Sequence, residues 1–586
     1  MARFAERYAA RSSIVFAAFL AIYASGAART VQGGDAGEFM ALSLLSGVAH
    51  PPGYPLFTML LSIAGFLPVG APAFRASLVS AALAAGAVAL LHGAVLRLTR
   101  SLPAAWIAAG FLGFSLTFWQ YATVAEVFAG GACTAALVIF ASARIAEGWR
   151  GHQAQLALGL SVATGIANHH TVILLAPLAF WAWFTALSRP LRPRTAVAET
   201  LTCAAGLACG FLAYLTLMIP GGGWRWGDTS SLGGLLHHFL RADYGTFQLA
   251  LNGAELRWWQ HPLYYLGRIP AQLFGVGALA AAAGVWGGLR SRRGFAAALL
   301  ATWVLAGPVF LAKFNVPLEG MGRVVAARFH ILPTVLSAVF IGFGVAWASR
   351  QPWGRLTAPL CALAVAAQGL TYHRHASHAE WTVMEDYVLN ALGAVEPGAL
   401  IVGNSDNFFF GALYAQRALG VRPDVAFLHP TMLAYDWYVD DMNARFPALN
   451  LPGYVPVPEL VAGNLDARPV YLTLALLAEP EVAAAVSAYP ESAVLMRAVS
   501  TPQDLPPPAQ VEVQMDAAVK SFIFRSKLTT DHQATETWEV WAVQQYAEAY
   551  MALARAYDGE RDVLAAARCR EKAALFAPPS ARQVAQ

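Results

Sequence analysis

Two acidic residues and a histidine follow directly after the first long hydrophobic segment, in the stretch GDAGEFMALSLLSGVAHPPGYPLF (34–57). Asp35 and Glu38 are three residues apart, so they share one face if this stretch is helical. A carboxylate here has two compatible uses: it caps a helix N-terminus, or it accepts a proton from a hydroxyl group that attacks a substrate. The spacing alone leaves both uses open.

The motif HPPGYP (50–55) predicts a rigid turn. Pro51 and Pro52 keep the preceding residues out of a helix, and Gly53 permits a bend. The turn explains the prolines but not the histidine. His50 is therefore a candidate donor to a phosphate or sugar oxygen, with Tyr54 beside it in the candidate pocket.

Two further groups of polar residues border hydrophobic segments. Glu126 stands near the start of one segment, where an acid is costly unless it faces water or a partner, so it is a functional candidate. Asn168, His169 and His170 lie together in NHHT. The paired histidines would suit a metal, but no clear third ligand is present, so we expect them to line the pocket and predict no metal site.

Arg323, Arg328 and His330 form a cationic group just before another hydrophobic segment. One interpretation is that snorkelling arginines contact lipid headgroups. The other is a phosphate clamp, because a guanidinium group binds phosphate oxygens with two hydrogen bonds and keeps its charge. Both interpretations are compatible with the sequence.

The composition identifies a membrane protein. Of the 586 residues, 57% are hydrophobic and 13% are charged, and the mean hydropathy is +0.49, whereas soluble domains have about 25% charged residues. The formal net charge of +4 gives no reason to expect a nucleic-acid partner. Four of the five cysteines lie in hydrophobic segments, so no disulfide framework is predicted.

A helix needs about 20 mostly apolar residues to cross the hydrocarbon core of a bilayer. The stretch 55–68 is too short for this and is predicted to be a re-entrant or interfacial helix in the first outer loop. About eleven other segments meet the requirement: 12–31, 73–96, 102–120, 125–145, 154–169, 171–188, 199–219, 263–289, 295–313, 330–348 and 355–372.

The arginines orient these segments. If 55–68 does not cross, the clusters RLTR (97–100), RPLRPR (189–194) and RSRR (290–293) all fall on the side of the N-terminal arginines. The positive-inside rule then predicts a cytoplasmic N-terminus and an extracytoplasmic C-terminal domain. We interpret the first segment as a retained signal anchor, with a cleaved signal peptide as the alternative. The Ala- and Arg-rich composition suggests a bacterial inner membrane.

Charged residues become regular from about Tyr372, which marks a domain boundary. We predict a transmembrane domain at 1–372, an extracytoplasmic α/β domain at 373–535 and a helical hairpin at 536–586. Strands are expected in ALIVGNSDN, DVAFLHP and RPVYLTLA, and a helix in NFFFGALYAQRALG. A plain amphipathic hairpin is the alternative to a single tetratricopeptide-type repeat, whose offsets are kept by Leu553, Ala554, Tyr557, Ala566, Ala573 and Pro578.

The motifs GDAGEF, HPPGYPL, NHHT and ARFH, with the tail stretch SDNFFFGALYAQRALGVRPDVAFLHPTMLAYDWY, together resemble a family of polytopic GT-C glycosyltransferases that was long catalogued as a membrane domain of unknown function. That family includes the eukaryotic endoplasmic-reticulum O-mannosyltransferase that acts on plexin-type immunoglobulin-like domains. The resemblance covers most of the chain. It implies a mainly α membrane protein, in which a GT-C-type helix bundle carries the C-terminal α/β domain and its hairpin.

The resemblance also implies a reaction. A sugar would pass from a polyprenyl-phosphate donor to a hydroxyl acceptor on the extracytoplasmic face, and the acid of the first loop would be the base. Carried onto this chain, that acid is Asp35, with Glu38 as helper or alternative, and Glu126 corresponds to a second outer acid of many relatives. Relatives read GDND-F where this chain has GNSDNFFF (403–410), so Asp406 is left as a structural residue.

In the expected mechanism, Asp35 removes the proton of the acceptor hydroxyl, and Arg328 with His330 or His50 stabilises the departing lipid phosphate. The lipid-linked sugar phosphate is a substrate, so no cofactor is predicted, and a need for a divalent cation is left open. The expected partners are the bilayer, the donor and a protein or glycan acceptor. A transporter or flippase and a non-catalytic scaffold are the alternatives; no convincing internal repeat favours a transporter.

Overall fold

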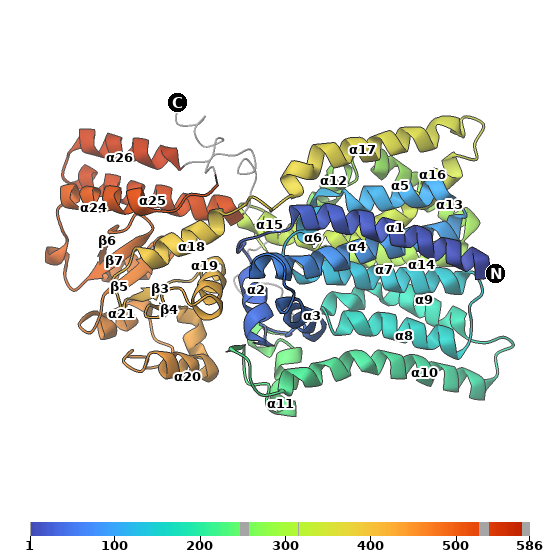
Figure 1. The fold of residues 1–586 in the computed structure, drawn as a ribbon, viewed down its shortest axis with the longest axis horizontal. Coiled ribbons are helices and arrows are strands. Elements are labelled where there is room, and N and C mark those ends of the chain that lie inside the picture. The colour runs from blue at the N-terminus through green and yellow to red at the C-terminus, as the bar shows by residue number, and fades with distance from the viewer. Residues whose placement is uncertain (1, 247–256, 315, 527–537, 577–586) are drawn as a thin grey trace. The chain divides into compact units, whose positions relative to one another are not determined.

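The computed structural model describes residues 2–246, 257–314, 316–526 and 538–576 of a mainly helical chain (Figure 1). The chain divides into two compact units, each made from separated parts of the sequence. Unit 1 comprises residues 1–28, 47–221 and 229–379, and unit 2 comprises residues 29–46, 222–228 and 380–586. The last division lies near the sequence-based boundary at 372/373, whereas a separate boundary at 535/536 stays a prediction.

Unit 1 is built almost entirely of helices. Helix α5 shows how the sequence starts one: the Ser101 side chain accepts a hydrogen bond from the Ala104 N–H, and a proline occupies the first turn. The elements of unit 1 are α1 (Ala2–Gly26), β1 (Gly47–Val48), α3 (Pro55–Gly65), α4 (Pro72–Thr99), α5 (Leu102–Gly113), α6 (Leu116–Ala122), α7 (Val127–Ala146), α8 (His152–Ile166), α9 (Ala176–Ala186), α10 (Pro193–Leu212), α11 (Leu232–Phe239), α12 (Gln260–Gln272), α13 (Val276–Ser291), α14 (Arg293–Val304), α15 (Met321–Arg328), α16 (Ile331–Ala348) and α17 (Thr357–Ala376).

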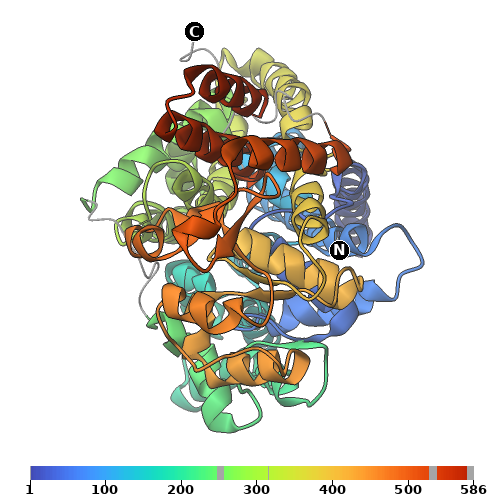
Figure 2. The same ribbon diagram turned by 90° about the vertical axis from the view of Figure 1, so that its left-hand side faces the viewer.

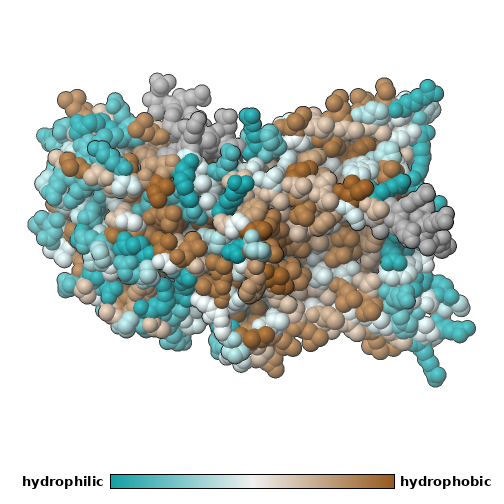
Figure 3. Space-filling view, in the orientation of Figure 1, coloured by the Kyte–Doolittle hydropathy of each residue, from teal (hydrophilic) through white to brown (hydrophobic). Residues whose placement is uncertain are grey.

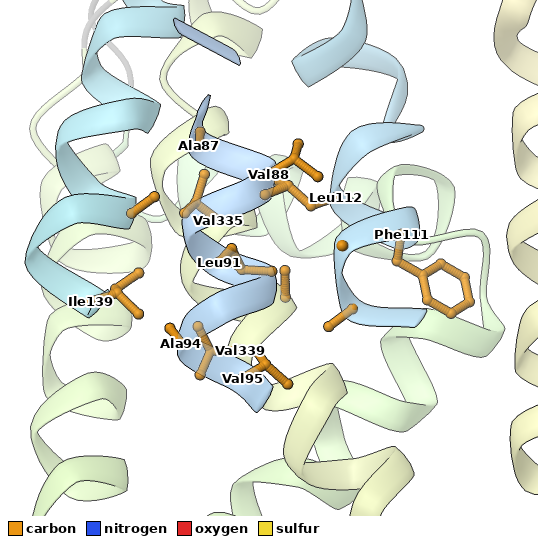
Figure 4. Close-up of a cluster of buried hydrophobic side chains, with 14 of the residues drawn as sticks. Ala87, Val88, Leu91, Ala94, Val95, Phe111, Leu112, Ile139, Val335 and Val339 are labelled. Atoms are coloured by element: carbon orange, nitrogen blue, oxygen red, sulfur yellow. The ribbon is translucent and has the colours of Figure 1, made fainter. Parts of the chain in front are cut away.

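Helix α4 lies in the core of unit 1, where Figure 4 shows its side chains facing those of α5, α7 and α16. Its apolar residues recur at helical spacing, so they present continuous surfaces to these neighbours. The buried side chains labelled in the figure are Ala87, Val88, Leu91, Ala94, Val95, Phe111, Leu112, Ile139, Val335 and Val339.

Helices α13 and α16 approach each other through glycines. A Cβ atom on Gly284 would lie 1.7 Å from the Phe340 carbonyl oxygen, and one on Gly344 would lie 1.9 Å from the Ala280 carbonyl oxygen. Small residues of this kind let the backbones of two membrane helices come into direct contact. The contact fixes the relative position of the two helices along their length.

Four helical segments are each long and apolar enough to cross a membrane: α4, α7, the run Pro193–Met218, and α16. Two bent pairs, α5 with α6 and α12 with α13, raise this number to six among the described residues if each pair counts as one span. Unit 1 is thus an integral membrane unit, and Figure 3 shows hydrophobic side chains over much of its visible face. The count of eleven spans stays a prediction.

The bent pairs differ from the straight spans predicted at 102–120 and 263–289, because the helices turn by 71° and 110°. The two breaks stabilise each other. The Ser115 hydroxyl donates to Gln272 Oε1 at 2.8 Å, and Gln272 Nε2 donates to Thr117 Oγ1 at 2.6 Å. Hydropathy records apolar length but not such long-range pairing, which supplies polar partners where a helix is interrupted.

Unit 2 contains a five-stranded mixed sheet with the order β4-β3-β5-β7-β6 (Figure 2). Strand β3 pairs in parallel with β4 and β5, whereas β7 pairs antiparallel with β5 and β6. The three strands expected from the sequence form β3, β4 and β5, whose mostly apolar residues are all buried, as is typical of parallel strands. The antiparallel strands β6 and β7 were not predicted.

The sheet is accompanied by helices from both ends of the sequence. The elements of unit 2 are α2 (Ala36–Leu45), β2 (Trp224–Arg225), α18 (Val383–Gly393), β3 (Leu400–Val402), α19 (Asp406–Leu413), β4 (Ala426–Leu428), α20 (Asp436–Arg445), α21 (Val457–Leu465), β5 (Val470–Thr473), α22 (Leu474–Leu477), α23 (Pro480–Ala485), β6 (Ser487–Tyr489), β7 (Leu495–Val499), α24 (Pro508–Ser521), α25 (Trp538–Gly559) and α26 (Val563–Leu575).

Helix α2 packs against α19 at a separation that requires a glycine. A Cβ atom on Gly37 would lie 2.6 Å from the carbonyl carbon and oxygen of Phe410 and 3.0 Å from the nitrogen of Gly411. Backbone atoms cannot move aside as a flexible side chain can. The acidic loop predicted to follow the first hydrophobic segment is therefore part of the same packed core as the C-terminal domain.

We expect Gly37→Ala to destabilise unit 2 by about 1–3 kcal/mol, because the added methyl group overpacks this contact. Hydrogen exchange over residues 36–45, with thermal melting of the full chain, would measure the effect. The matched control is Gly393→Ala, since a Cβ atom on that helical glycine meets nothing within 4 Å. Equal protection of 36–45 in both variants would contradict the prediction.

Helices α24, α25 and α26 form the C-terminal part of unit 2. Leu553, Ala554, Tyr557, Ala566 and Ala573 are buried in it, whereas Pro578 lies outside the described residues. Helices α25 and α26 form the expected hairpin, and the tetratricopeptide interpretation of it stays a prediction.

Glu512 of α24 joins this hairpin through a group of charged hydrogen bonds. It accepts from Arg568 at 2.9 and 2.8 Å, from Lys572 at 2.9 Å and from Tyr557 at 2.8 Å. The hydrogen bonds from Arg568, followed by those from Lys572 and Tyr557, lower the pKa of Glu512 from 4.5 to about 2. The carboxylate therefore stabilises the folded hairpin in its ionised form.

This pKa shift predicts a pH dependence of stability. A folded-state pKa below the unfolded one stabilises the fold above the unfolded pKa, and that stability is lost as the pH falls from about 4.5 to about 2. We expect the hydrogen-exchange protection of α26 to fall in this range in the native chain and to change less with pH in Glu512→Gln. Glu560→Gln, at an exposed position, is the control and should keep the native profile.

Candidate functional site

Asp35 lies at the N-terminus of α2, in a segment that later parts of unit 2 hold by its backbone. The Gly34 N–H donates to Asn407 Oδ1 at 2.6 Å, and the Val31 N–H donates to Glu385 Oε2 at 3.0 Å. Asp35 is the N-cap residue and is partly exposed, whereas the residues on either side of it are buried. The segment thus presents one carboxylate at a defined position that solvent reaches.

Glu38 has a different environment one helical turn further on. Its side chain is fully buried, and the Trp224 indole N–H donates to Glu38 Oε1 at 3.0 Å. The Trp224 ring in turn makes edge contacts with Trp226 and Phe409, at centroid distances of 6.3 and 6.0 Å. Glu38 therefore connects α2 to the segment 222–228, which suits a residue that positions Asp35 rather than one that meets a substrate.

Asp406 and His429 are neighbours in unit 2. His429 Nε2 lies 3.8 Å from Asp406 Oδ1. Burial lowers the pKa of His429 to about 4, so the histidine is neutral near pH 7 and the pair is not an ion pair there. The structural assignment of Asp406 stays a prediction.

In unit 1 the turn HPPGYP brings His50 and Tyr54 together. The Tyr54 hydroxyl and His50 Nε2 are 3.0 Å apart. Tyr54 is the N-cap residue of α3 with a φ of 46°, and its ring stacks on His169 at a centroid distance of 5.9 Å and an interplanar angle of 17°. Two of the predicted motifs, HPPGYP and NHHT, therefore meet through this tyrosine.

Two aromatic rings connect this group to Arg328. Phe128 lies 5.7 Å from His169 and 5.4 Å from Phe329 between ring centroids. The Arg328 guanidinium lies 5.4 Å from the centre of the Phe128 ring, within the range of a cation–π contact. We call His50, Tyr54, His169, Phe128 and Arg328 the His50–Arg328 cluster.

The His50–Arg328 cluster lies among basic side chains. The electrostatic neighbours of His169 are His50, His170, Arg241 and Arg328. The two arginines carry permanent charge, and guanidinium groups bind phosphate oxygens with paired hydrogen bonds. This arrangement suits a phosphate group better than a cation or a neutral ligand.

The rest of the NHHT motif supports this cluster. Asn168 is buried and its Nδ2 donates to the Val127 carbonyl oxygen at 3.0 Å. The Thr171 N–H donates to His169 Nδ1 at 3.2 Å, which places the proton of the neutral imidazole on Nε2. The His170 ring packs edge-on against Phe239 at 4.8 Å. Asn168 therefore binds the backbone of α7, whereas His169 belongs to the His50–Arg328 cluster.

Three other predicted residues have different neighbours. Glu126 is buried at the start of α7, where its backbone N–H and carbonyl both pair with Ser80 Oγ at 3.1 Å. Arg323 is exposed, and its Nε–H donates to the Leu318 carbonyl oxygen at 2.5 Å.

His330 is buried and lies 5.0 Å from the Tyr265 ring. The sequence analysis grouped Arg323, Arg328 and His330, and that grouping stays a prediction. Helix α15 ends at Arg328, and His330 is the N-cap residue of α16.

Several residues of these sites were missed by the sequence analysis. Phe128 follows Glu126 by two residues and Phe329 stands inside the quoted motif ARFH, so an aromatic residue beside a polar candidate was an available signal. Arg241 and Asn407 carried no local signal. Among the described residues, no group of three His, Cys, Asp or Glu side chains is placed to hold a metal ion.

Several known proteins are similar to this chain in sequence. A family model described as the Protein O-mannosyl-transferase TMEM260 N-terminal domain matches residues 35–191. The chain is 29% identical over 466 residues to Protein O-mannosyl-transferase TMEM260 of Mus musculus, and the match covers 76% of this chain and 66% of that protein. It is 24% identical over 516 residues to Protein O-mannosyl-transferase tmem260 of Dictyostelium discoideum. That match covers 78% of this chain and 63% of the relative.

The chain is similar to TMEM260 proteins. It spans just under two thirds of the length of these relatives. Their names agree with the family resemblance drawn from the motifs, at the level of a membrane glycosyltransferase, and the family model includes Asp35, His50, Glu126 and His169 in its matched range.

Solved structures of ArnT from Cupriavidus metallidurans also match. The form bound to undecaprenyl phosphate has a TM-score of 0.49 and 12% sequence identity, and covers 85% of this chain and 98% of its own. The apo form has a TM-score of 0.46 and 12% identity, with 86% and 99% coverage.

Proposed function

We propose that this chain is a membrane glycosyltransferase that moves a sugar from a polyprenyl-phosphate donor to a hydroxyl group of a protein or glycan at the extracytoplasmic membrane face. Its similarity to proteins named O-mannosyl-transferase supports the reaction class. The observation that carries the proposal is the environment of Asp35, a partly exposed acid on an anchored backbone beside a buried, hydrogen-bonded Glu38.

Asp35 is proposed as the general base. The acceptor oxygen forms a bond to the anomeric carbon of the donor while the bond from that carbon to the phosphate oxygen breaks. The hydroxyl proton passes to the Asp35 carboxylate, and the bonding electron pair leaves with the polyprenyl phosphate. Glu38 is proposed as a positioning residue, because it binds Trp224 instead of facing solvent.

The His50–Arg328 cluster is proposed to bind the donor phosphate. Negative charge grows on this phosphate as the sugar leaves, so cationic and N–H donors stabilise the transition state more than the bound donor. His50 and Arg328 supply such groups. The proposal rests on His50 and Arg328, whereas a phosphate role of Arg323 and His330 stays a prediction.

The proposal includes a bacterial inner-membrane location, a cytoplasmic N-terminus and an extracytoplasmic unit 2. The arginine distribution in the sequence supports this orientation. The acceptor would be held by unit 2, whose half-buried aromatic residues Tyr435 and Trp437 could stack on a sugar or a peptide.

The test is incubation of the purified full chain with a panel of polyprenyl-phosphate sugars, beginning with mannose, and a hydroxyl-bearing peptide. We expect release of polyprenyl phosphate that depends on the peptide. A flippase would move the donor between the leaflets of vesicles without cleaving the sugar–phosphate bond. Absence of release with every donor, together with absence of any thermal shift, would remove the glycosyltransferase proposal.

A further inference from the structure

Unit 1 contains a basic cavity built from residues that the proposed reaction does not use. Its volume is about 530 Å³, and it is lined by the C-terminal ends of α4, α13 and α16. Four arginines contribute to the lining, Arg100, Arg290, Arg292 and Arg350, and none of the lining residues, all of which the structure describes, is acidic. A cavity of this size is large enough for a small-molecule ligand or a lipid headgroup.

The contacts of these arginines are made with neutral groups. Arg350 Nη2 donates to the Thr99 carbonyl oxygen at 3.2 Å, and Arg292 Nη1 donates to the Ala146 carbonyl oxygen at 3.4 Å. The Arg290 guanidinium lies 4.1 Å from the centre of the Trp286 ring.

These contacts hold the side chains in place but do not neutralise them. Glu147 forms an ion pair with Arg97 at 2.9 Å, and neither of these two residues lines the cavity. Each guanidinium also has five N–H donors, more than these contacts use.

The helix ends alone do not balance this charge. A helix C-terminus carries roughly half a negative charge, so three of them offer about −1.5. The four arginines carry four permanent positive charges. Positively charged residues fix the orientation of membrane helices, which explains why arginines occur at these helix ends. This effect does not explain why four of them line one cavity. The remaining positive charge favours an anionic ligand.

The position of the cavity favours a lipid as the source of that anion. Helices α4 and α16 are two of the segments able to cross a membrane, and the cavity lies at their ends. Trp286 and Trp353 are 51% and 65% exposed, and Trp353 contacts the lining residue Trp347 at 6.2 Å. Exposed tryptophans at the ends of membrane helices are typical of the headgroup region.

We propose that this cavity binds the phosphate group of an anionic phospholipid, held between Arg290, Arg292 and Arg350. Basic pockets between the ends of membrane helices are a known means of binding such headgroups. The site is independent of the proposed transferase reaction, because it contains none of the residues assigned to the base or to the donor phosphate. Binding there would link α4, α13 and α16 at one end of unit 1.

The purified full chain would be tested by native mass spectrometry in detergent, with phosphatidylglycerol, phosphatidylcholine or inorganic phosphate added. We expect phosphatidylglycerol to be retained and phosphatidylcholine to be lost. We also expect the affinity for phosphatidylglycerol to be about 25-fold lower in the double variant Arg290→Gln/Arg292→Gln, since each surface arginine contributes about fivefold to binding an anionic headgroup. The control Arg192→Gln/Arg194→Gln removes two exposed charges outside the cavity and should bind normally.

A second variant protects the test from misfolding. Arg290→Lys/Arg292→Lys keeps both charges and should keep most of the binding, with a lipid-free melting temperature close to that of the native chain. Equal phosphatidylglycerol affinity in the native chain and the glutamine variant would overturn the proposal. Tight binding of inorganic phosphate without retention of phosphatidylglycerol would overturn the lipid assignment.

Discussion

Replacement of Asp35 by asparagine is expected to lower turnover of the polyprenyl-phosphate sugar by about 10²–10⁴-fold, the usual contribution of a general base. Asparagine cannot accept the proton of the acceptor hydroxyl. The fold should be kept, because asparagine is nearly the same size as aspartate and position 35 is partly exposed. Released polyprenyl phosphate and the melting temperature of the full chain are the two measurements.

The matched control for this prediction is Glu459→Gln. Glu459 is also an acid in the first turn of a helix of unit 2, and it is exposed. Turnover in this variant should stay within about twofold of the native value, since exposed substitutions away from a site have small effects. If Asp35→Asn keeps native turnover, Asp35 is not the base, and the base must be sought elsewhere.

The second large effect is expected at Arg328. Arg328→Gln removes a permanent positive charge from the His50–Arg328 cluster. Loss of one preorganised donor to a developing anion costs about 10²–10³-fold in turnover. Arg328→Lys should recover part of this loss, because the charge remains while the paired hydrogen bonds of the guanidinium do not. Rates of polyprenyl phosphate release at saturating and at low donor concentration would measure the effect.

The control for Arg328 is Arg374→Gln. Arg374 lies in the last turn of α17, is exposed and makes the same change of charge. We expect it to leave turnover nearly unchanged. Equal losses in the two variants would indicate a general effect of net charge and would contradict a phosphate site at the His50–Arg328 cluster.

The sequence indicated a large part of the candidate sites because chemistry-bearing motifs are local. HPPGYP places His50 and Tyr54 in one turn, and in the structure the Tyr54 hydroxyl lies 3.0 Å from His50 Nε2. The resemblance drew attention to NHHT and ARFH, and His169 and Arg328 from these motifs do lie in one cluster with the Phe128 ring. The different environments of Asp35 and Glu38 were not predictable, since their spacing is equally compatible with capping and with catalysis.

The membrane character of unit 1 was determined by the sequence alone, because the free energy of transfer into lipid is close to a sum over residues and needs no knowledge of neighbours. The strands β3, β4 and β5 could also be predicted from the sequence, since short apolar runs bounded by turn residues are typical of buried strands.

Only the tertiary structure showed that residues 29–46 belong to the same compact unit as the C-terminal domain. That association depends on contacts such as the hydrogen bond from the Gly34 N–H to Asn407, 373 positions away, and the approach of Gly37 to the Phe410 backbone. The two helix breaks at Ser115 and Gln272 were decided in the same way. Such pairings leave no periodic pattern in either segment, because each residue's hydrogen-bond or packing partner lies far away in the sequence.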